Sequence, residues 1–146
     1  GALSDEIKMR DVVIALAASS DSNYGTAFGL QGYFVPAADY GMLSNAVEAA
    51  KKLRINAVVG TVYTSDHFYH PCPELNERLR NLGHLAVEME TAGLYWTAAG
   101  CRKKALSILT ISDHIFTGEA LSAEDRQESF HEMMELALET ALQSIE

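Results

Sequence analysis

Short apolar runs alternate along the chain with stretches in which apolar residues recur at helical spacing. The first run lies within residues 10–19 (DVVIALAAS), and the second is INAVVGTVYTSD at 55–66. HLAVEM at 84–89 and ALSILTIS at 105–112 have the same strand-like length. Each run predicts a β-strand, and the unbroken apolarity of 105–112 predicts a strand that is buried on both faces.

Four helices are predicted between and after these strands. They cover residues 43–54, a short stretch that begins at Pro73-Glu74, Glu90 to about Gly100, and Ser122 to the C-terminus. Ser122 and Asp125 have the spacing of a capping box at the start of the last helix. The apolar stripe of that helix consists of Phe130, Met133, Met134, Ala137, Ala141 and Ile145. Residues 20–39 contain three glycines and a proline and predict a long loop.

Strands that alternate with helices predict an α/β fold, with a largely parallel or mixed central sheet flanked by helices. A length of 146 residues fits one domain over residues 1–146. The sequence has no internal repeat, low-complexity segment or linker. Because it begins at Gly1 and enters a strand almost at once, we expect a processed or truncated piece of a longer protein.

Charge and cysteine content exclude several classes of partner. The chain has 11 Lys and Arg against 20 Asp and Glu, a net charge of −9, so neither nucleic acid nor an anionic membrane surface is expected to bind it. Cys72 and Cys101 form no C-x-x-C pair, and no apolar run is long enough to span a membrane. These features predict a cytoplasmic protein.

Polar residues follow three of the predicted strands. They are the runs 65–69 (SDHFY), 88–90 (EME) and 112–114 (SDH). If these strands are parallel, their carboxyl ends meet at one edge of the sheet, where α/β folds usually bind ligands. The sequence therefore predicts a binding site formed by these three strand ends.

Glu88 and Glu90 allow two interpretations. Glu90 suits the first turn of a helix, where the dipole makes a carboxylate favourable by about 0.5 kcal/mol. This explanation fits Glu88 less well, since it lies one strand period earlier. Two carboxylates on the same side would instead accept hydrogen bonds from a ligand rich in hydroxyl groups.

Asp113 and Arg126 are candidates for acid catalysis. Asp113 ends an apolar strand, and apolar surroundings favour the uncharged form of a carboxyl group, which suits a proton donor. Alternatively, it caps the following turn. Arg126 places a cation in the first turn of a helix, against the dipole. Either it pairs with Glu124 or Asp125, or it reaches back to Asp113.

The segment 66–72 (DHFYHPC) raises the question of a metal site. Its H-x-x-H-x-C spacing, with Asp66 beside it, matches no strong zinc pattern, so no metal site is predicted. Phe68 and Tyr69 form an aromatic pair. An aromatic wall near carboxylates suits a flat heterocycle attached to a sugar.

Taken together, VEMETAGLY (87–95), ISDHIFTGE (111–119) and AEDRQESFHEMMELALET (123–140) resemble the hexameric, bacterial-type purine nucleoside phosphorylases. DVVIALAASSDS and SDHFYHP fit the same family, so the resemblance covers the whole chain. It implies reversible phosphorolysis of a purine (deoxy)ribonucleoside to the free base and (deoxy)ribose 1-phosphate, in purine salvage. It also implies a homohexamer arranged as a trimer of dimers, with phosphate as co-substrate and no cofactor.

The resemblance assigns roles to residues at the sugar. Glu90 corresponds to the glutamate that binds the ribose hydroxyls, and Met89 to the methionine that packs under the sugar. Glu88 corresponds to a neighbouring residue of the site. The residues implied for the walls around the base are Phe68, which stacks on it, with Tyr69 and Val87.

At the base, the resemblance implies that Ser112 and Asp113 bind the purine. Asp113 would protonate or hydrogen-bond N7 as the glycosidic bond breaks. Arg126 corresponds to the arginine that moves toward this aspartate and helps it act as the acid.

The family's phosphate-binding residues are expected to lie before Gly1, so this chain would carry the base and sugar half of the site. Two alternatives remain open. One is a purine nucleosidase of the same superfamily, which uses water in place of phosphate. The other is a non-catalytic fragment that binds nucleoside.

Overall fold

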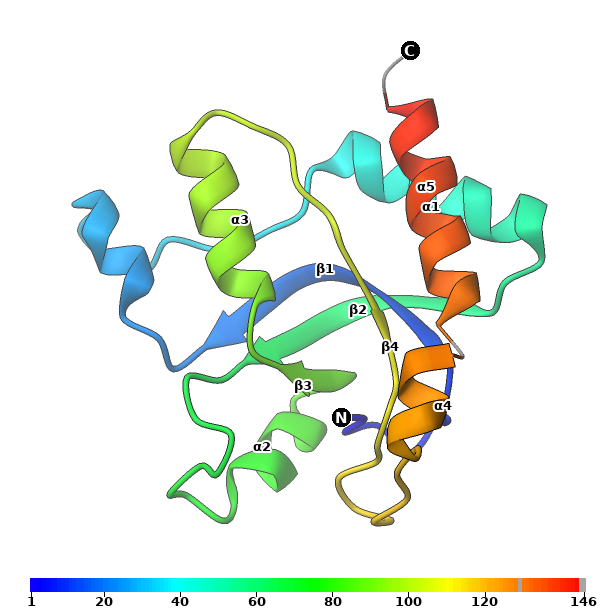
Figure 1. Cartoon of the computed structure of the whole chain (residues 1–146). Coiled ribbons are helices and arrows are strands. Elements are labelled where there is room, and N and C mark those ends of the chain that lie inside the picture. The colour runs from blue at the N-terminus through cyan, green and yellow to red at the C-terminus, as the bar shows by residue number, and fades with distance from the viewer. Residues whose placement is uncertain (129, 145–146) are drawn as a thin grey trace.

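A mixed four-stranded sheet forms the centre of the molecule, in the order β3-β2-β1-β4 (Figure 1). The computed structural model describes residues 1–128 and 130–144. The strands are β1 (Val12–Ser20), β2 (Ala57–Thr64), β3 (Ala86–Glu88) and β4 (Ser107–Thr110). β1, β2 and β3 run parallel, whereas β4 is antiparallel to β1. The predicted α/β fold with a largely parallel, mixed sheet is confirmed.

Helices connect these strands at nearly the predicted places. They are α1 (Tyr40–Leu53), α2 (Leu75–Asn81), α3 (Thr91–Gly100), α4 (Ala123–Glu128) and α5 (His131–Gln143), with a short 3-10 helix η1 (Tyr24–Phe28). None of the described helices is long and apolar enough to cross a membrane.

Two predictions about the helices are wrong. The segment 20–39 is not purely a loop, because η1 lies in it and packs on α3 through the rings of Tyr24 and Trp96. The last helix is divided into α4 and α5, with Phe130 as the N-cap of α5. The predicted cap at Ser122 is confirmed, since its Oγ accepts a 3.0 Å hydrogen bond from Asp125 N. Ile145, assigned to the apolar stripe, lies outside the described residues.

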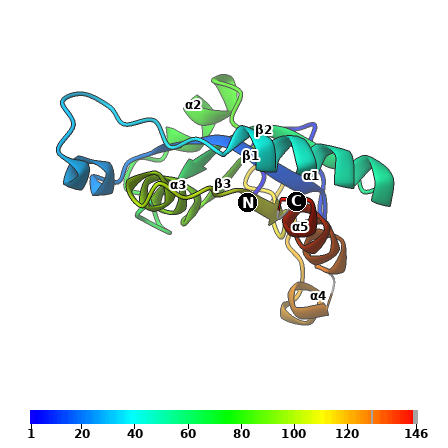
Figure 2. The same ribbon diagram turned by 90° about the horizontal axis from the view of Figure 1, so that it is seen from above.

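β1 is the centre of the hydrophobic core because its side chains alternate between two packed faces. Val13 and Ala15 pack with Trp96 of α3, and Val12 and Ile14 pack with α1 and α5. α1 and α5 lie against each other (Figure 2). This two-sided packing makes β1 and β2 a rigid support for the chain segments that follow them.

β4 differs from the prediction in direction and in burial. It is antiparallel to β1, and all four of its residues are only partly buried. β1 is the only described strand with which it pairs. The apolar run predicted complete burial, but one face of this edge strand borders a cavity instead.

The segment Gly1–Leu3 connects the two sides of the curved sheet. Leu3 N donates to Leu85 O at 2.9 Å, and Val87 N donates to Gly1 O at 2.9 Å. On its other side, Ala2 N donates to Asp113 O at 2.8 Å. Residues 1–3 therefore lie between β3 and the chain that follows β4.

Candidate active site

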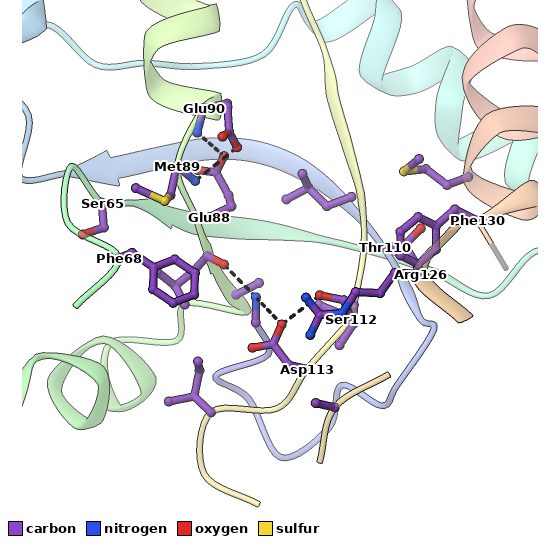
Figure 3. A pocket seen from close by; sticks show the side chains of 18 of the residues that line it. Ser65, Phe68, Glu88, Met89, Glu90, Thr110, Ser112, Asp113, Arg126 and Phe130 are labelled. Atoms are coloured by element: carbon purple, nitrogen blue, oxygen red, sulfur yellow. Dashed lines mark hydrogen bonds and ion pairs between the residues drawn. The ribbon is translucent and has the colours of Figure 1, made fainter. Parts of the chain in front are cut away.

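A cavity of about 690 Å³ lies between the β3–α3 turn and the chain that follows β4 (Figure 3). The predicted site residues that line it are Phe68, Val87, Glu88, Met89, Glu90, Ser112, Asp113 and Arg126. Tyr69 does not line it. Its side chain is 89% exposed and forms an edge-to-face pair with the Phe68 ring, with centroids 5.0 Å apart.

The strand ends meet for a different reason from the one predicted. Because β4 is antiparallel, its carboxyl end lies beside the start of β1, at the opposite end from Glu88. The expectation that three parallel strand ends meet at one edge is therefore wrong. Val87 and Asp113 come together because both are hydrogen-bonded to the segment 1–3 that runs between them.

Glu88 stabilises the start of α3. Its Oε2 accepts hydrogen bonds from the backbone N–H groups of Glu90 and Thr91, both at 2.7 Å. Its Oε1 accepts a hydrogen bond from the hydroxyl of Thr64 on β2. These N–H groups have no partner within the helix, so Glu88 supplies the carboxylate that the dipole favours. The sequence had suggested Glu90 for this role.

Glu90 is left facing the cavity. Its carboxylate is exposed and accepts a long hydrogen bond, 3.3 Å, from Met89 N. Figure 3 shows Glu90, Met89 and Phe68 along the same side of the cavity. The Met89 and Phe68 side chains are 41% and 78% exposed, so this side offers a carboxylate acceptor beside uncovered apolar groups.

Ser112, Asp113 and Arg126 form the opposite side. Ser112 Oγ donates a 2.8 Å hydrogen bond to Asp113 Oδ1. Arg126 Nε donates to Leu121 O at 3.2 Å, and its guanidinium points toward Asp113 in Figure 3. Between described residues, no ion pair joins Arg126 to Asp113. This side of the cavity therefore presents a hydroxyl, a carboxyl group and a guanidinium to the polar edge of a ligand.

An apolar wall completes the cavity, and the sequence did not identify it. Ile108 of β4, Phe130 and Met133 line it together with Thr110 (Figure 3). The sequence had assigned Phe130 and Met133 only to the apolar stripe of the last helix. Thr110 Oγ1 is buried and has no hydrogen-bond partner among the described residues. This wall can cover an apolar or aromatic part of a ligand.

Thr64 is a second residue that the sequence did not identify. It is 3% exposed, and its Oγ1 accepts a 2.9 Å hydrogen bond from Ala92 N while donating to Glu88. The feature of the sequence that could have identified Thr64 is its position as a polar residue at the end of an apolar strand.

Beside the cavity, Asp21 contacts the loop that carries Phe68. Asp21 Oδ2 lies 3.5 Å from His67 Nδ1 and 3.3 Å from His70 Nε2. The sequence had grouped these histidines with Cys72, but the Cys72 thiol donates to Glu74 Oε2 at 3.4 Å. Asp21 was not identified because it lies more than 40 residues before either histidine.

Comparisons with known proteins agree on one family. The model of the phosphorylase superfamily matches residues 1–146. "Purine nucleoside phosphorylase DeoD-type 2" of Vibrio cholerae is 47% identical over 142 residues, 97% of this chain. "Purine nucleoside phosphorylase DeoD-type" of Colwellia psychrerythraea is 48% identical over 142 residues, also 97% of the chain, and that of Bacillus velezensis is 47% identical over 141 residues, 96% of the chain.

These relatives are longer than the chain. The matched segments cover 60% of the Vibrio and Bacillus proteins and 61% of the Colwellia protein. The chain thus spans about 60% of the length of the curated relatives it matches.

Proposed function

This chain belongs to the phosphorylase superfamily, and from that we propose that it acts in the reversible phosphorolysis of purine nucleosides. The observation that supports the proposal is the cavity, which has Glu90 and Met89 on one side and Ser112 and Asp113 on the other. The names of the relatives support the same reaction.

The sugar would bind on the side of Glu90. Its exposed carboxylate accepts hydrogen bonds from ribose hydroxyls, and Met89 packs against the sugar. Glu88 acts indirectly, because its carboxylate is occupied by Thr64 and the N–H groups at the start of α3. Phe68, at the open side, would cover the base.

The base would bind on the side of Asp113. Protonation or hydrogen bonding of purine N7 by Asp113 withdraws electrons from the base, which makes it a better leaving group. Arg126 would move toward Asp113 and favour transfer of the proton. Phosphate, as co-substrate, would stabilise the positive charge that develops on the sugar and then bond to its anomeric carbon. No cofactor enters this proposal, and the phosphate ligands are not assigned to described residues.

Three further proposals rest on the family resemblance: a homohexamer built as a trimer of dimers, a cytoplasmic location and a role in purine salvage. Sedimentation velocity on the purified chain tests the first of these. A species of six chains supports it, and a stable monomer at working concentration contradicts it.

The decisive experiment measures release of hypoxanthine from inosine, with and without phosphate. Release that requires phosphate supports phosphorolysis. Release without phosphate would instead establish a nucleosidase. If inosine binds but no base is released under either condition, the chain is a nucleoside-binding fragment and the proposed activity fails.

A further inference from the structure

Three side chains at the border of the cavity, of which His67 also lines it, bring potential metal ligands together. Asp21 follows β1, while His67 and His70 lie on the loop between β2 and α2. One nitrogen from each ring and one carboxylate oxygen all lie within 4.8 Å of one another. The three side chains are partly accessible, with 19% (Asp21), 59% (His67) and 25% (His70) exposed, so an ion can reach them from solvent.

The distances match neighbouring ligands of one ion better than hydrogen bonds. Asp21 Oδ2 is 3.5 Å from His67 Nδ1 and 3.3 Å from His70 Nε2. An N–H to carboxylate hydrogen bond is usually about 2.7–2.9 Å long. Ligands at about 2.0–2.1 Å from a tetrahedral zinc ion lie about 3.3 Å from each other.

The carboxylate is already held in position for this role. Asp21 Oδ1 accepts a 2.8 Å hydrogen bond from Asp66 N, while Oδ2 faces the two rings and also accepts a 3.4 Å hydrogen bond from Ser65 Oγ. Carboxylates that bind metals commonly have such a second partner.

We propose that Asp21, His67 and His70 form a binding site for a divalent transition-metal ion of the zinc class, with water completing its coordination. Two imidazole nitrogens and one carboxylate oxygen are a donor set that suits zinc, and the net charge of −9 favours cations near the surface.

Metal binding changes an existing contact of His70. His70 Nδ1 now accepts a 3.1 Å hydrogen bond from Cys72 N. Ligation through Nε2 places the ring proton on Nδ1, so this hydrogen bond is lost and the turn at 70–72 shifts. The bound ion links the loop that carries Phe68 to the residue that follows β1.

The test is titration of the chelator-treated chain with Zn²⁺ by calorimetry, and with Co²⁺ by visible absorption. We expect one ion per chain and the intense absorption of tetrahedral Co²⁺. Asp21→Asn, His67→Asn and His70→Asn should each weaken binding by about tenfold or more. The matched control is His131→Asn, because His131 is an exposed histidine on α5 outside the cluster; it should bind as the parent does.

Two results would overturn the proposal. One is unchanged affinity in the three cluster variants, each shown by circular dichroism to be folded. The other is loss of binding in Cys72→Ser together with unchanged binding in Asp21→Asn, which would restore the H-x-x-H-x-C grouping. Because His67 is 59% exposed, His67→Asn should fold even if Asp21→Asn does not. None of these readouts depends on phosphorolysis.

Discussion

The buried hydroxyl of Thr64 donates a hydrogen bond to Glu88 and accepts one from Ala92 N. One side chain at the end of β2 thus joins the end of β3 to the first turn of α3. Glu90 lies within that junction, so its direction into the cavity depends on a residue that does not line the cavity.

Thr64→Val should destabilise the fold. Valine keeps the shape of threonine but leaves Ala92 N–H and Glu88 Oε1 without their partner in a buried position. Loss of a buried partner costs about 1–3 kcal/mol of unfolding free energy, measurable by urea denaturation. Thr64→Ser, which keeps the hydroxyl, is the control and should lose less. Equal stability of the valine variant and the parent would contradict the role of this hydroxyl.

Substitutions of Glu88 and Glu90 should have different effects, the first on stability and the second on activity. Glu88→Ala removes the acceptor at the start of α3 and should lower the unfolding free energy by about 1–2 kcal/mol. Glu90→Ala should change it by less than about 0.5 kcal/mol, since its carboxylate is exposed. In an inosine assay, Glu90→Ala should raise KM and lower kcat. An effect of Glu90→Ala on stability alone would return Glu90 to the helix-dipole interpretation.

Asp113→Asn should reduce turnover of 6-oxopurine nucleosides by about 100-fold or more, which is the rate loss expected when a general acid is removed. An amide keeps the shape and still accepts the 2.8 Å hydrogen bond from Ser112, so inosine binding should persist. Steady-state kinetics and calorimetry measure the two effects separately. Asp5→Asn, on the surface, serves as control. Unchanged turnover in Asp113→Asn would remove Asp113 from the acid role.

His84 should make stability depend on pH. Its Nδ1 bonds to Leu79 O at 3.2 Å, and because a carbonyl only accepts, Nε2 must accept from Ser19 Oγ at 2.9 Å. Burial lowers the pKa of His84 below its ordinary 6.5, although the bond to Leu79 O acts in the opposite direction. The unfolded chain therefore takes up the proton first as the pH falls.

The stabilisation from neutral His84 is accordingly complete above pH 6.5 and is lost as the pH falls toward the lowered pKa of the folded state. The difference in unfolding free energy between the parent and His84→Gln should shrink over that range. His131→Gln, on the surface, should show no such change. A difference that stays constant with pH would contradict the lowered pKa.

The sequence predicted the elements of the fold better than their arrangement. β1 and α1 have clear apolar periodicity, which local residue types determine. The direction of β4 depends on its pairing with β1, which lies almost 100 positions earlier in the chain. An apolar run predicts a strand but does not indicate whether that strand pairs in parallel or antiparallel. The division between α4 and α5 was missed because no glycine or proline interrupts residues 122–143.

At the site too, the sequence showed which residues are neighbours along the chain but not which side chains contact each other. The sequence placed both Glu88 and Glu90 near a ligand, but only the hydrogen bonds show which of the two carboxylates is already occupied. Asp21 had no recognisable neighbour in the sequence, because its partners follow the next strand. Phe130 and Met133 have the spacing of core residues, and spacing does not distinguish a core from a cavity wall.

The segment 1–3 also affects the order in which the molecule folds. It joins Val87 and Asp113, so the cavity requires contacts between residues that are 86 and 111 positions apart. Such distant contacts form late, because the loop between them must close first. We therefore expect the helices and the β1–β2 pair to form before the cavity does, so that a ligand can bind in the cavity only after the last step of folding.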